Sequence, residues 1–541
     1  MRVALVNVED GIASNGFRRM ASHVKSYHPE TTSCYVIPDQ NALWERAFPS
    51  GPSRSRTDFA DQVAESLSGW DLVGFSSVTM RAPTVEAIIA RLRAKSPETY
   101  IVWGGSHGIM APEAAIEHAD AVCTGEGERP FQILLESLRD GRDHFHAPNF
   151  WLRRGESVVK NSFDPLLSSA ELNDLPPPEY ADPDEAIFET NSGFVPMRRR
   201  HYLRYNGLSY RTIWSIGCPF HCTYCGNTKF IANDPGYRKI RHSEVDTLMR
   251  ELRNVVTRHP HVRSMIFEDD SFMALKTEVI EEFCEAYREE IGIPFTVTGV
   301  IPNYVQQRKL DLLVRAGLVR IRMGIQSGSD RILDFYKRPS PRKKVMEAAE
   351  VIHRFQPHMM PPDYDIIADN PIETEEDVRD TLQLIYDLPR PFHLNLFSLT
   401  IMPNTELECQ FDDLAVGLKD AIQSYRRLAP TLANATLYLL CLVKPPRWMM
   451  KRILERAKPS HLPQPEYPLS HKILRTLWTL RRSWHHFRFM GFINYPGALA
   501  YSLYRSGLVA TRQRARAIWS RRLFAKTPKT VADTVAAADG T

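Results

Sequence analysis

The stretch Ile216-Gly-Cys-Pro-Phe-His-Cys-Thr-Tyr-Cys-Gly-Asn227 places three cysteines on one short loop, directly after an apolar strand pattern. Cys218, Cys222 and Cys225 follow a CxxxCxxC spacing. Three thiolates on one loop can hold three irons of a [4Fe–4S] cluster, which leaves the fourth iron for a small molecule that chelates through an amine and a carboxylate. A zinc site is the alternative, but structural zinc takes four ligands and no fourth cysteine lies nearby, although His221 is available.

A series of strands and helices surrounds this loop. Helical patterns such as 243–256 and 374–388 separate short apolar runs. The expected strands cover residues 211–216, 263–268, 294–299, 319–326, 362–368 and 393–400. Six such units predict a partial (β/α)6 barrel, whose site lies at the carboxyl ends of the strands.

The cysteine loop and the strand series together resemble the radical S-adenosylmethionine (SAM) superfamily, with Tyr224 as the aromatic residue of its CxxxCxΦC motif. The resemblance implies that Cys218, Cys222 and Cys225 bind the cluster and that SAM is the chelating molecule. It also implies that Tyr224 and the backbone at Gly226 approach the adenine. An oxygen-sensitive enzyme follows from this chemistry.

Polar residues at later strand ends resemble the SAM-binding segments of that family. In FEDDSF, Glu268, Asp269 and Asp270 end the second strand and resemble the family position that contacts the SAM amino group. Asp269 is the expected contact, with the capping of a turn as the alternative. In MGIQSGSD, Gln326 and Ser327 match the segment that binds ribose and carboxylate. Arg338 matches a basic residue common in the subgroup, with a solvated helix-end arginine as the alternative.

The fifth-strand segment DIIADNPIETEED departs from the family pattern G-x-P-G-E-T. Asp369 and Ile372 replace its two glycines. The backbone turn there must therefore differ or tolerate a side chain.

Residues 1–143 alternate β-branched runs with amphipathic helices, which predicts a doubly wound, Rossmann-like parallel sheet. Ligands of such sheets bind at loops that follow the strands, and glycines there let a backbone approach a bulky ligand. The order and spacing of these loops resemble the cobalamin-binding domain fused ahead of many radical SAM cores. The implied cobalamin contacts are Ser76, Ser77, Gly104, Gly105, His107, Gly125, Glu126 and Gly127.

The D-x-H-x-x-G motif, whose histidine ligates cobalt in other cobalamin enzymes, is absent. We therefore expect cobalamin to bind base-off, with no histidine from that motif. For His107 an ordinary loop or phosphate-side histidine is favoured over a cobalt ligand. A degenerate domain that has lost cobalamin is the alternative.

Three further segments complete the expected organisation. Residues 144–205 are rich in prolines and acids and predict a linker across a neighbour's surface. Residues 206–410 form the radical SAM core. Residues 411–541 predict a mostly helical, basic and aromatic region that ends in a disordered tail.

The whole chain has the composition of a multidomain globular protein. Its 541 residues carry a net charge of +4, with 43% hydrophobic and 24% charged residues. The eight cysteines form no disulfide framework and fit a reducing compartment. Glu9 and Asp10 directly after the first apolar run do not fit a secretory signal, so we expect a cytoplasmic protein.

The segment from His471 to Ala525 contains arginines, lysines and aromatic residues but no Asp or Glu. It predicts one of two roles: peripheral association with the anionic surface of the inner membrane, or binding of an acidic substrate. No nucleic-acid module accompanies it. Helices that pack on the barrel with a solvated basic face are an equally weighted interpretation.

These observations favour a C-methyltransferase that acts on an unactivated carbon of a lipid, isoprenoid or secondary metabolite. One SAM would remethylate cobalamin and another would supply the radical, so no protein general base is expected. An external electron donor such as flavodoxin or ferredoxin is the expected partner. The alternatives are a radical cyclase, oxidase or rearrangement enzyme, and a non-catalytic cobalamin- or cluster-binding sensor.

Overall fold

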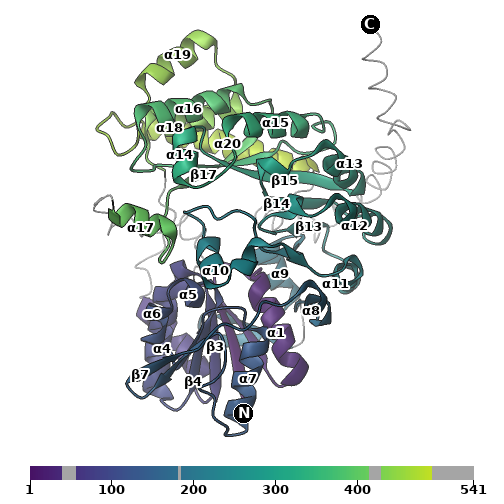
Figure 1. Cartoon of the computed structure of the whole chain (residues 1–541), viewed down its shortest axis with the longest axis vertical. Coiled ribbons are helices and arrows are strands. Elements are labelled where there is room, and N and C mark those ends of the chain that lie inside the picture. Colours follow the sequence, from purple (N-terminus) through teal and green to yellow (C-terminus); the bar gives the residue numbers. More distant parts are fainter. Residues whose placement is uncertain (39–55, 181–183, 414–427, 490–541) are drawn as a thin grey trace.

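The computed structural model describes residues 1–38, 56–180, 184–413 and 428–489. An N-terminal sheet lies at the bottom of Figure 1, a second sheet lies above it, and the last helices lie at the top. The α/β class with two sheets and a helical C-terminal region is confirmed.

The N-terminal sheet has the strand order β7-β6-β5-β4-β3-β1-β2-β8-β9. Its inner strands are parallel, so the doubly wound core is confirmed. These core strands are β1 Val3–Val8, β2 Thr32–Val36, β3 Leu72–Ser77, β4 Tyr100–Gly104 and β5 Ala121–Cys123. All three residues of β5 and all six of β1 are buried, as expected of strands covered on both faces.

Helices cover both faces of this sheet. One face packs against α1 Asn15–Tyr27 and α7 Glu128–Arg139. The other packs against α3 Arg56–Leu67, α4 Ala82–Lys95 and α6 Pro112–Ile116. Two short helices follow strands of the core, η1 Thr79–Arg81 after β3 and α5 Gly105–Met110 after β4.

The segment 144–205, expected to be a linker, instead contributes four strands to the N-terminal sheet. On one side, β6 pairs antiparallel with β5, and β7 pairs antiparallel with β6. On the other side, β8 pairs parallel with β2, and β9 pairs antiparallel with β8. These elements are β6 Phe150–Arg154, β7 Ser157–Lys160, α8 Ser169–Asp174, β8 Glu185–Glu189, β9 Gly193–Pro196 and α9 Arg199–Asn206. Short, half-polar edge strands lack the apolar run that marks central strands, which is why periodicity alone missed them.

The proline-rich part of that segment does cross a neighbouring surface. Ser22 on α1 donates to the carbonyl of Pro177 at 2.6 Å, and Arg18 donates to the carbonyl of Glu179 at 2.6 Å. Arg18 is buried and also donates to the Tyr210 hydroxyl and the Arg211 carbonyl in the second sheet. This one guanidinium therefore joins α1, the connecting segment and the barrel.

The second sheet has six parallel strands in sequential order, as the partial barrel requires. The strands are β10 Ser209–Thr212, β13 Ser264–Phe267, β14 Phe295–Val300, β15 Leu318–Gln326, β16 Asp363–Ala368 and β17 His393–Ser398. A separate antiparallel pair, β11 Ser215–Ile216 and β12 Arg241–His242, flanks the cysteine loop. The loop thus follows β11 and not the first barrel strand.

Helices connect and surround the barrel strands. Near the cysteine loop these are α10 Asn227–Asn233, η2 Pro235–Arg238 and α11 Val245–Arg258. The next are η3 Phe272–Ala274, α12 Thr277–Glu290, η4 Pro302–Tyr304 and α13 Gln307–Ala316. The last are α14 Asp330–Phe335, α15 Arg342–His353, α16 Glu375–Asp387 and α17 Glu406–Asp413.

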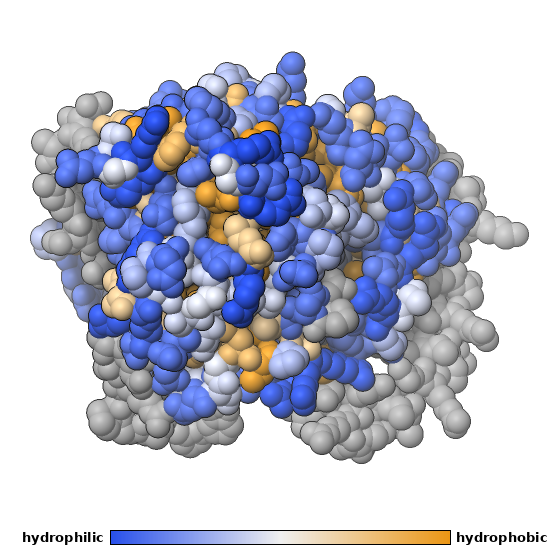
Figure 2. Space-filling view, turned by 90° about the horizontal axis from the view of Figure 1, so that it is seen from below, coloured by the Kyte–Doolittle hydropathy of each residue, from blue (hydrophilic) through white to orange (hydrophobic). Residues whose placement is uncertain are grey.

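Three helices complete the described chain: α18 Leu432–Leu442, α19 Arg447–Arg456 and α20 Pro468–Phe489. The expected tail and the basic residues beyond 489 lie outside the described residues. Among the helices that the structure describes, none is both long and apolar enough to cross a membrane. Seen from below, the molecule is largely hydrophilic, with apolar residues in small patches (Figure 2).

Candidate active site

The cysteine loop is held at both ends by backbone contacts. The Cys218 amide donates to the Tyr237 carbonyl at 3.0 Å, and the Thr223 amide donates to the Tyr336 carbonyl at 3.0 Å. Gly217 has a φ of 109°, and a Cβ there would lie 2.5 Å from the Lys239 carbonyl oxygen. Only glycine fits this close backbone approach, which sets the direction of the loop.

The three thiols share a mostly buried environment with one cation. Burial raises the pKa of Cys218 to about 11 and of Cys225 to about 12. Arg338 is buried, and its Nη1 lies 3.7 Å from the Cys222 Sγ. The guanidinium therefore favours thiolate character on the loop, which iron ligation needs.

Within the described ranges, no three His, Cys, Asp or Glu side chains form a group fit for a single metal ion. A [4Fe–4S] cluster places each cysteine on a different iron and so requires wider spacing. The donor set of three thiolates on one loop fits such a cluster.

The carboxylates Asp269 and Asp270, which follow β13, face different surroundings. Asp269 is buried and accepts bonds from the Ser215 amide and hydroxyl, both at 2.5 Å, and from the Trp214 amide at 3.3 Å. Asp270 is accessible, yet the surrounding protein raises its pKa, and its charge acts on Cys218 and Cys225. Asp270 is thus a solvent-accessible carboxylate whose charge acts on the cysteine loop.

The end of β15 is distorted where Gln326 stands. The pairing of β15 with β16 shifts register between Gly324 and Gln326, and Gln326 has a φ of 75°. A Cβ on Gly324 would lie 2.6 Å from the Gln326 Nε2 and 3.1 Å from an Arg338 nitrogen. Bulges re-aim side chains, and left-handed backbone in a non-glycine residue is characteristic of functional sites.

Ser327 is buried, and its hydroxyl bonds to other groups of the protein. Its hydroxyl lies 3.2 Å from the Thr381 hydroxyl and accepts from the Ser329 amide at 3.2 Å. Ser329 in turn caps α14 and donates to Asp377 at 2.5 Å. The hydroxyl of Ser327 therefore shapes this loop, while Gln326 is the side chain beside it that stays partly accessible.

Tyr224 and Gly226 lie on opposite sides of the cysteine loop. The Tyr224 hydroxyl accepts from Arg338 at 3.4 Å, and its ring meets Tyr336 edge-on at 4.9 Å. Gly226 precedes α10, and a Cβ there would lie 3.6 Å from the Met110 sulfur of α5. The N-terminal domain thus touches the cysteine loop directly.

The turn after β16, the fifth barrel strand, accommodates the side chain of Asp369, which replaces a glycine of the family pattern. Asp369 has a φ of 57°, a conformation that Asp adopts more readily than most residues. Its carboxylate accepts from Asn434 at 2.8 Å and from the Ala429 amide at 3.2 Å. These bonds tie the turn to α18.

In the N-terminal domain, the loops after β3 and β4 pack on each other. Gly105 has a φ of 75°, and a Cβ there would lie 2.7 Å from the Ser76 hydroxyl. The Ser77 hydroxyl accepts from Trp103 at 3.0 Å. A Cβ on Gly104 would meet only ordinary contacts, 3.5 Å from the Cys123 Cβ and 3.9 Å from the Phe75 carbonyl oxygen. The geometry therefore assigns Gly105 and Ser77 a part in shaping these loops.

Two buried polar side chains at this end of the sheet lack partners. His107 packs 4.8 Å from the Trp103 ring, and neither ring nitrogen has a hydrogen-bond partner in the described part of the chain. Burial lowers the pKa of His107 to about 4. Asn7, beside Ser76 in the sheet register, is fully buried, and both of its amide atoms lack partners among the described residues.

Buried polar groups are normally paired, so these two fit a polar ligand at the carboxyl end of the central strands. That is where the sequence predicts cobalamin. His107, Asn7 and the accessible Ser76 are the residues that would contact it there.

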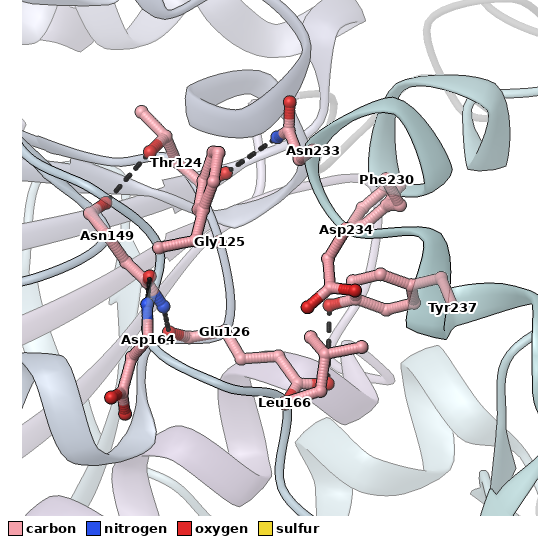
Figure 3. A pocket seen from close by; sticks show the side chains of 11 residues that line it. Thr124, Gly125, Glu126, Asn149, Asp164, Leu166, Phe230, Asn233, Asp234 and Tyr237 are labelled. Atoms are coloured by element: carbon pink, nitrogen blue, oxygen red, sulfur yellow. Dashed lines mark hydrogen bonds between the residues drawn. The ribbon is translucent and has the colours of Figure 1, made fainter.

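The loop after β5 faces the barrel (Figure 3). Glu126 pairs with Arg241 at 2.7 Å and accepts from the Tyr237 hydroxyl at 3.2 Å. Asn233 donates to the Thr124 carbonyl at 3.0 Å. The cavity between these residues has room for about one water molecule. Glu126 is therefore placed as a bridge between domains.

The two glycines beside Glu126 make room for neighbouring side chains. A Cβ on Gly125 would lie 3.0 Å from the Asn149 amide nitrogen, and one on Gly127 would lie 3.5 Å from the Met20 sulfur. Asn149 donates to the Glu126 carbonyl at 2.7 Å. The glycines thus serve packing within the N-terminal domain.

Several residues at the contact between the N-terminal domain and the barrel belong to no motif that the sequence analysis identified. Asn404, after β17, donates to the Met110 carbonyl at 2.8 Å and so holds α5 against the barrel. Arg241 and Tyr237 bind Glu126 from β12 and η2. Among the site residues that the motifs missed, only Asn7 could have been identified from the sequence, because an amide side chain inside an apolar strand is unusual.

Comparison with known proteins agrees with this geometry. Residues 212–385 match the family model of the radical SAM superfamily, and residues 50–135 match that of the B12 binding domain. The chain therefore contains a radical SAM domain. A B12-binding domain precedes it, and a [4Fe–4S] cluster, SAM and cobalamin are the cofactors that these two domains support.

Curated relatives are distant. The chain is 22% identical over 317 residues to an uncharacterized methyltransferase of Pyrococcus horikoshii, covering 58% of this chain and 63% of the relative. It is 26% identical to a cytidylyl-2-hydroxyethylphosphonate methyltransferase of Streptomyces wedmorensis, covering 50% and 53%. It is 24% identical to an anaerobic magnesium-protoporphyrin IX monomethyl ester cyclase of Rubrivivax gelatinosus, covering 54% and 50%. The chain thus matches between half and 63% of these relatives' lengths.

Solved structures share the fold. The radical SAM methyltransferase TsrM from Kitasatospora setae aligns with a TM-score of 0.59 at 15% identity, over 77% of both chains. The cobalamin-dependent SAM radical enzyme OxsB aligns with a TM-score of 0.52 at 14% identity, over 84% of this chain and 61% of that one. At such identities the likeness concerns the fold alone.

Proposed function

We propose that this protein is a cobalamin-dependent radical SAM C-methyltransferase acting on an unactivated carbon. One observation carries the proposal: α5, which contains the unpartnered His107, packs directly against the cysteine loop at Gly226. A methyl carrier and a radical source can act on one substrate only if their sites adjoin. The methyltransferases among the relatives support the same reaction class.

When bound, the cluster would supply the electron that cleaves SAM to a 5′-deoxyadenosyl radical, and cobalamin would carry the methyl group. Cys218, Cys222 and Cys225 hold the cluster, and Arg338 keeps cationic charge beside Cys222. Asp270 is suited to accept from the SAM ammonium group.

The partly accessible amide of Gln326 is suited to the SAM ribose, since it can both donate and accept. Gly324 leaves room for this amide, because a Cβ there would lie 2.6 Å from the Gln326 Nε2. Asp269 has a different part: it fixes β11, from which the cysteine loop starts.

The base-off binding mode belongs to the same proposal. The absent D-x-H-x-x-G motif and the burial of His107 against Trp103 support it. Electron paramagnetic resonance (EPR) of the protein with cob(II)alamin should show no nitrogen splitting from an axial ligand, and a His107→Ala variant should give the same signal. Nitrogen splitting in the wild type would contradict base-off binding.

The test of the methyltransferase is an anaerobic incubation of the reconstituted protein with SAM, a strong reductant and cobalamin. Mass spectrometry should detect both 5′-deoxyadenosine and S-adenosylhomocysteine, and a Cys222→Ala variant should form no 5′-deoxyadenosine. Flavodoxin or ferredoxin is the proposed physiological donor and should replace the chemical reductant.

A radical cyclase or oxidase without methyl transfer is the second candidate, because the cyclase of Rubrivivax gelatinosus is as similar as the methyltransferases. 5′-Deoxyadenosine without S-adenosylhomocysteine, from protein that retains cobalamin, would favour it. The substrate class proposed for either reaction is a lipid, isoprenoid or secondary metabolite.

A further inference from the structure

Helix α20 exposes a stripe of apolar side chains to solvent. Its members are Leu469, Ile473, Leu477, Leu480 and Trp484, between 48% and 69% exposed. At about 100° of rotation per residue they fall within an arc of about 80° and extend along about 22 Å of helix. We call these five residues the α20 stripe. A contiguous apolar surface of this kind marks an interaction site.

The opposite face of α20 is polar and packs on the protein. Arg481 donates to the carbonyls of Cys441 and Leu442 at 2.8 and 2.7 Å. The Arg482 guanidinium lies 3.3 Å from Asp363 inside the barrel, which Arg320 also contacts at 2.5 Å. Because these buried bonds fix the cationic face inward, α20 cannot rotate to bury its stripe.

A second inward contact confirms this orientation. His393 of β17 and His485 of α20 lie 2.9 Å apart through their ring nitrogens. Trp478, on the same inward side, packs 5.5 Å from Tyr438 of α18. The barrel strands thus present polar groups to α20, which explains why this helix carries its apolar residues outside.

Cations border the stripe. Lys472 and Arg488 are exposed and lie within about 60° of its edges on the helical wheel, and α20 contains no acidic residue. From Tyr467 to Ala532 the sequence has thirteen Lys and Arg and no Asp or Glu. An apolar stripe bordered by cations, on a helix without acidic residues, is complementary to an anionic lipid surface, where the helix lies in the plane of the headgroups.

We infer that α20 is a membrane-surface helix that seats this enzyme on anionic lipid through the α20 stripe. A second copy of the chain is a weaker fit, because a symmetric pair would bring the same cations together. Nucleic acid would require the cations at the centre of the contact, where only apolar side chains lie. The inference does not depend on which reaction the enzyme catalyses.

The experiment is co-sedimentation of the full-length, reconstituted protein with vesicles. One vesicle is phosphatidylcholine alone and the other contains equal parts phosphatidylcholine and phosphatidylglycerol. The wild type should bind the anionic vesicle, and raising NaCl from about 0.1 M to about 0.5 M should weaken binding. A triple variant, Ile473→Ser, Leu480→Ser and Trp484→Ser, should bind at least about tenfold more weakly.

Trp448 offers a matched control, since it is 62% exposed on basic α19 and Trp484 is 61% exposed. A Trp448→Ser variant should bind vesicles as the wild type does. Both variants should retain iron content and thermal stability, because the replaced side chains are exposed.

Three outcomes would overturn the inference. The wild type fails to bind anionic vesicles, or the triple variant binds as well as the wild type, or Trp448→Ser loses as much binding as the triple variant. A wild-type dimer that the triple variant converts to a monomer, without vesicle binding, would assign the stripe to a second copy.

Discussion

At the scale of single residues, the sequence best predicts functional residues that lie close together along the chain. Cys218, Cys222 and Cys225 stand within eight residues, so their spacing alone predicts a shared site. Asp269 and Asp270 are adjacent, and the family resemblance assigned the SAM contact to Asp269. The choice depends on the amide and hydroxyl of Ser215, which only the folded chain brings to Asp269.

This difference predicts opposite effects of two neighbouring substitutions. Asp270→Asn should weaken SAM binding about tenfold while the cluster stays intact, because a charge-assisted hydrogen bond to the ammonium is lost. Asp269→Asn should instead lower the free energy of unfolding by about 1–3 kcal/mol, because it weakens buried bonds to β11. Equilibrium dialysis with SAM and chemical denaturation measure the two effects. The reverse assignment would show that Asp269 is the SAM ligand.

At the scale of elements, the central strands were predictable and the edge strands were not. Val3–Val8 is a fully buried run, whereas Ser157–Lys160 and Gly193–Pro196 are short and contain no buried residue. Pairing with β6 and β8, far along the sheet, decides their conformation. The orientation of α20 was likewise hidden, because it depends on polar groups inside the barrel.

The contact between β12 and the loop that follows β5 should stabilise the protein less when one of its charges is removed. Glu126 and Arg241 have side chains only 16% and 10% exposed, so Glu126→Gln leaves a buried guanidinium without its anion. The free energy of unfolding should fall by about 2–4 kcal/mol, measured by denaturation. Arg308→Gln is the control: it breaks an exposed pair with Glu281 and should cost about 0.5 kcal/mol or less. Equal effects of both variants would refute the bridging role of Glu126.

The contact between β17 and α20 predicts a pH dependence of stability. Burial lowers the pKa of His393 from 6.5 to about 3, so the unfolded chain binds this proton more readily than the folded one. The free energy of unfolding should therefore decrease as pH falls below 6.5, by about 1.4 kcal/mol per pH unit for this group. Between pH 6.5 and about 5, a His393→Gln variant should lose about 2 kcal/mol less than the wild type. Parallel curves would show that His393 is not the group responsible.

At the scale of the whole molecule, the structure brings two ligand-binding edges together. The carboxyl end of the N-terminal sheet meets the cysteine loop through Met110 and Gly226, and it meets β12 through Glu126 and Arg241. Motifs in the sequence predicted each edge separately. Their contact involves residues such as Asn404 and Met110, nearly 300 positions apart, which no local pattern reveals.

The central claim is that Cys218, Cys222 and Cys225 hold a cluster whose fourth iron binds SAM. EPR spectroscopy of the reduced, reconstituted protein with and without SAM tests it most directly. We expect a [4Fe–4S] signal whose line shape changes when SAM is added, and we expect that signal to be lost in Cys222→Ala. A cluster signal that SAM leaves unchanged, or one that survives in Cys222→Ala, would contradict the claim.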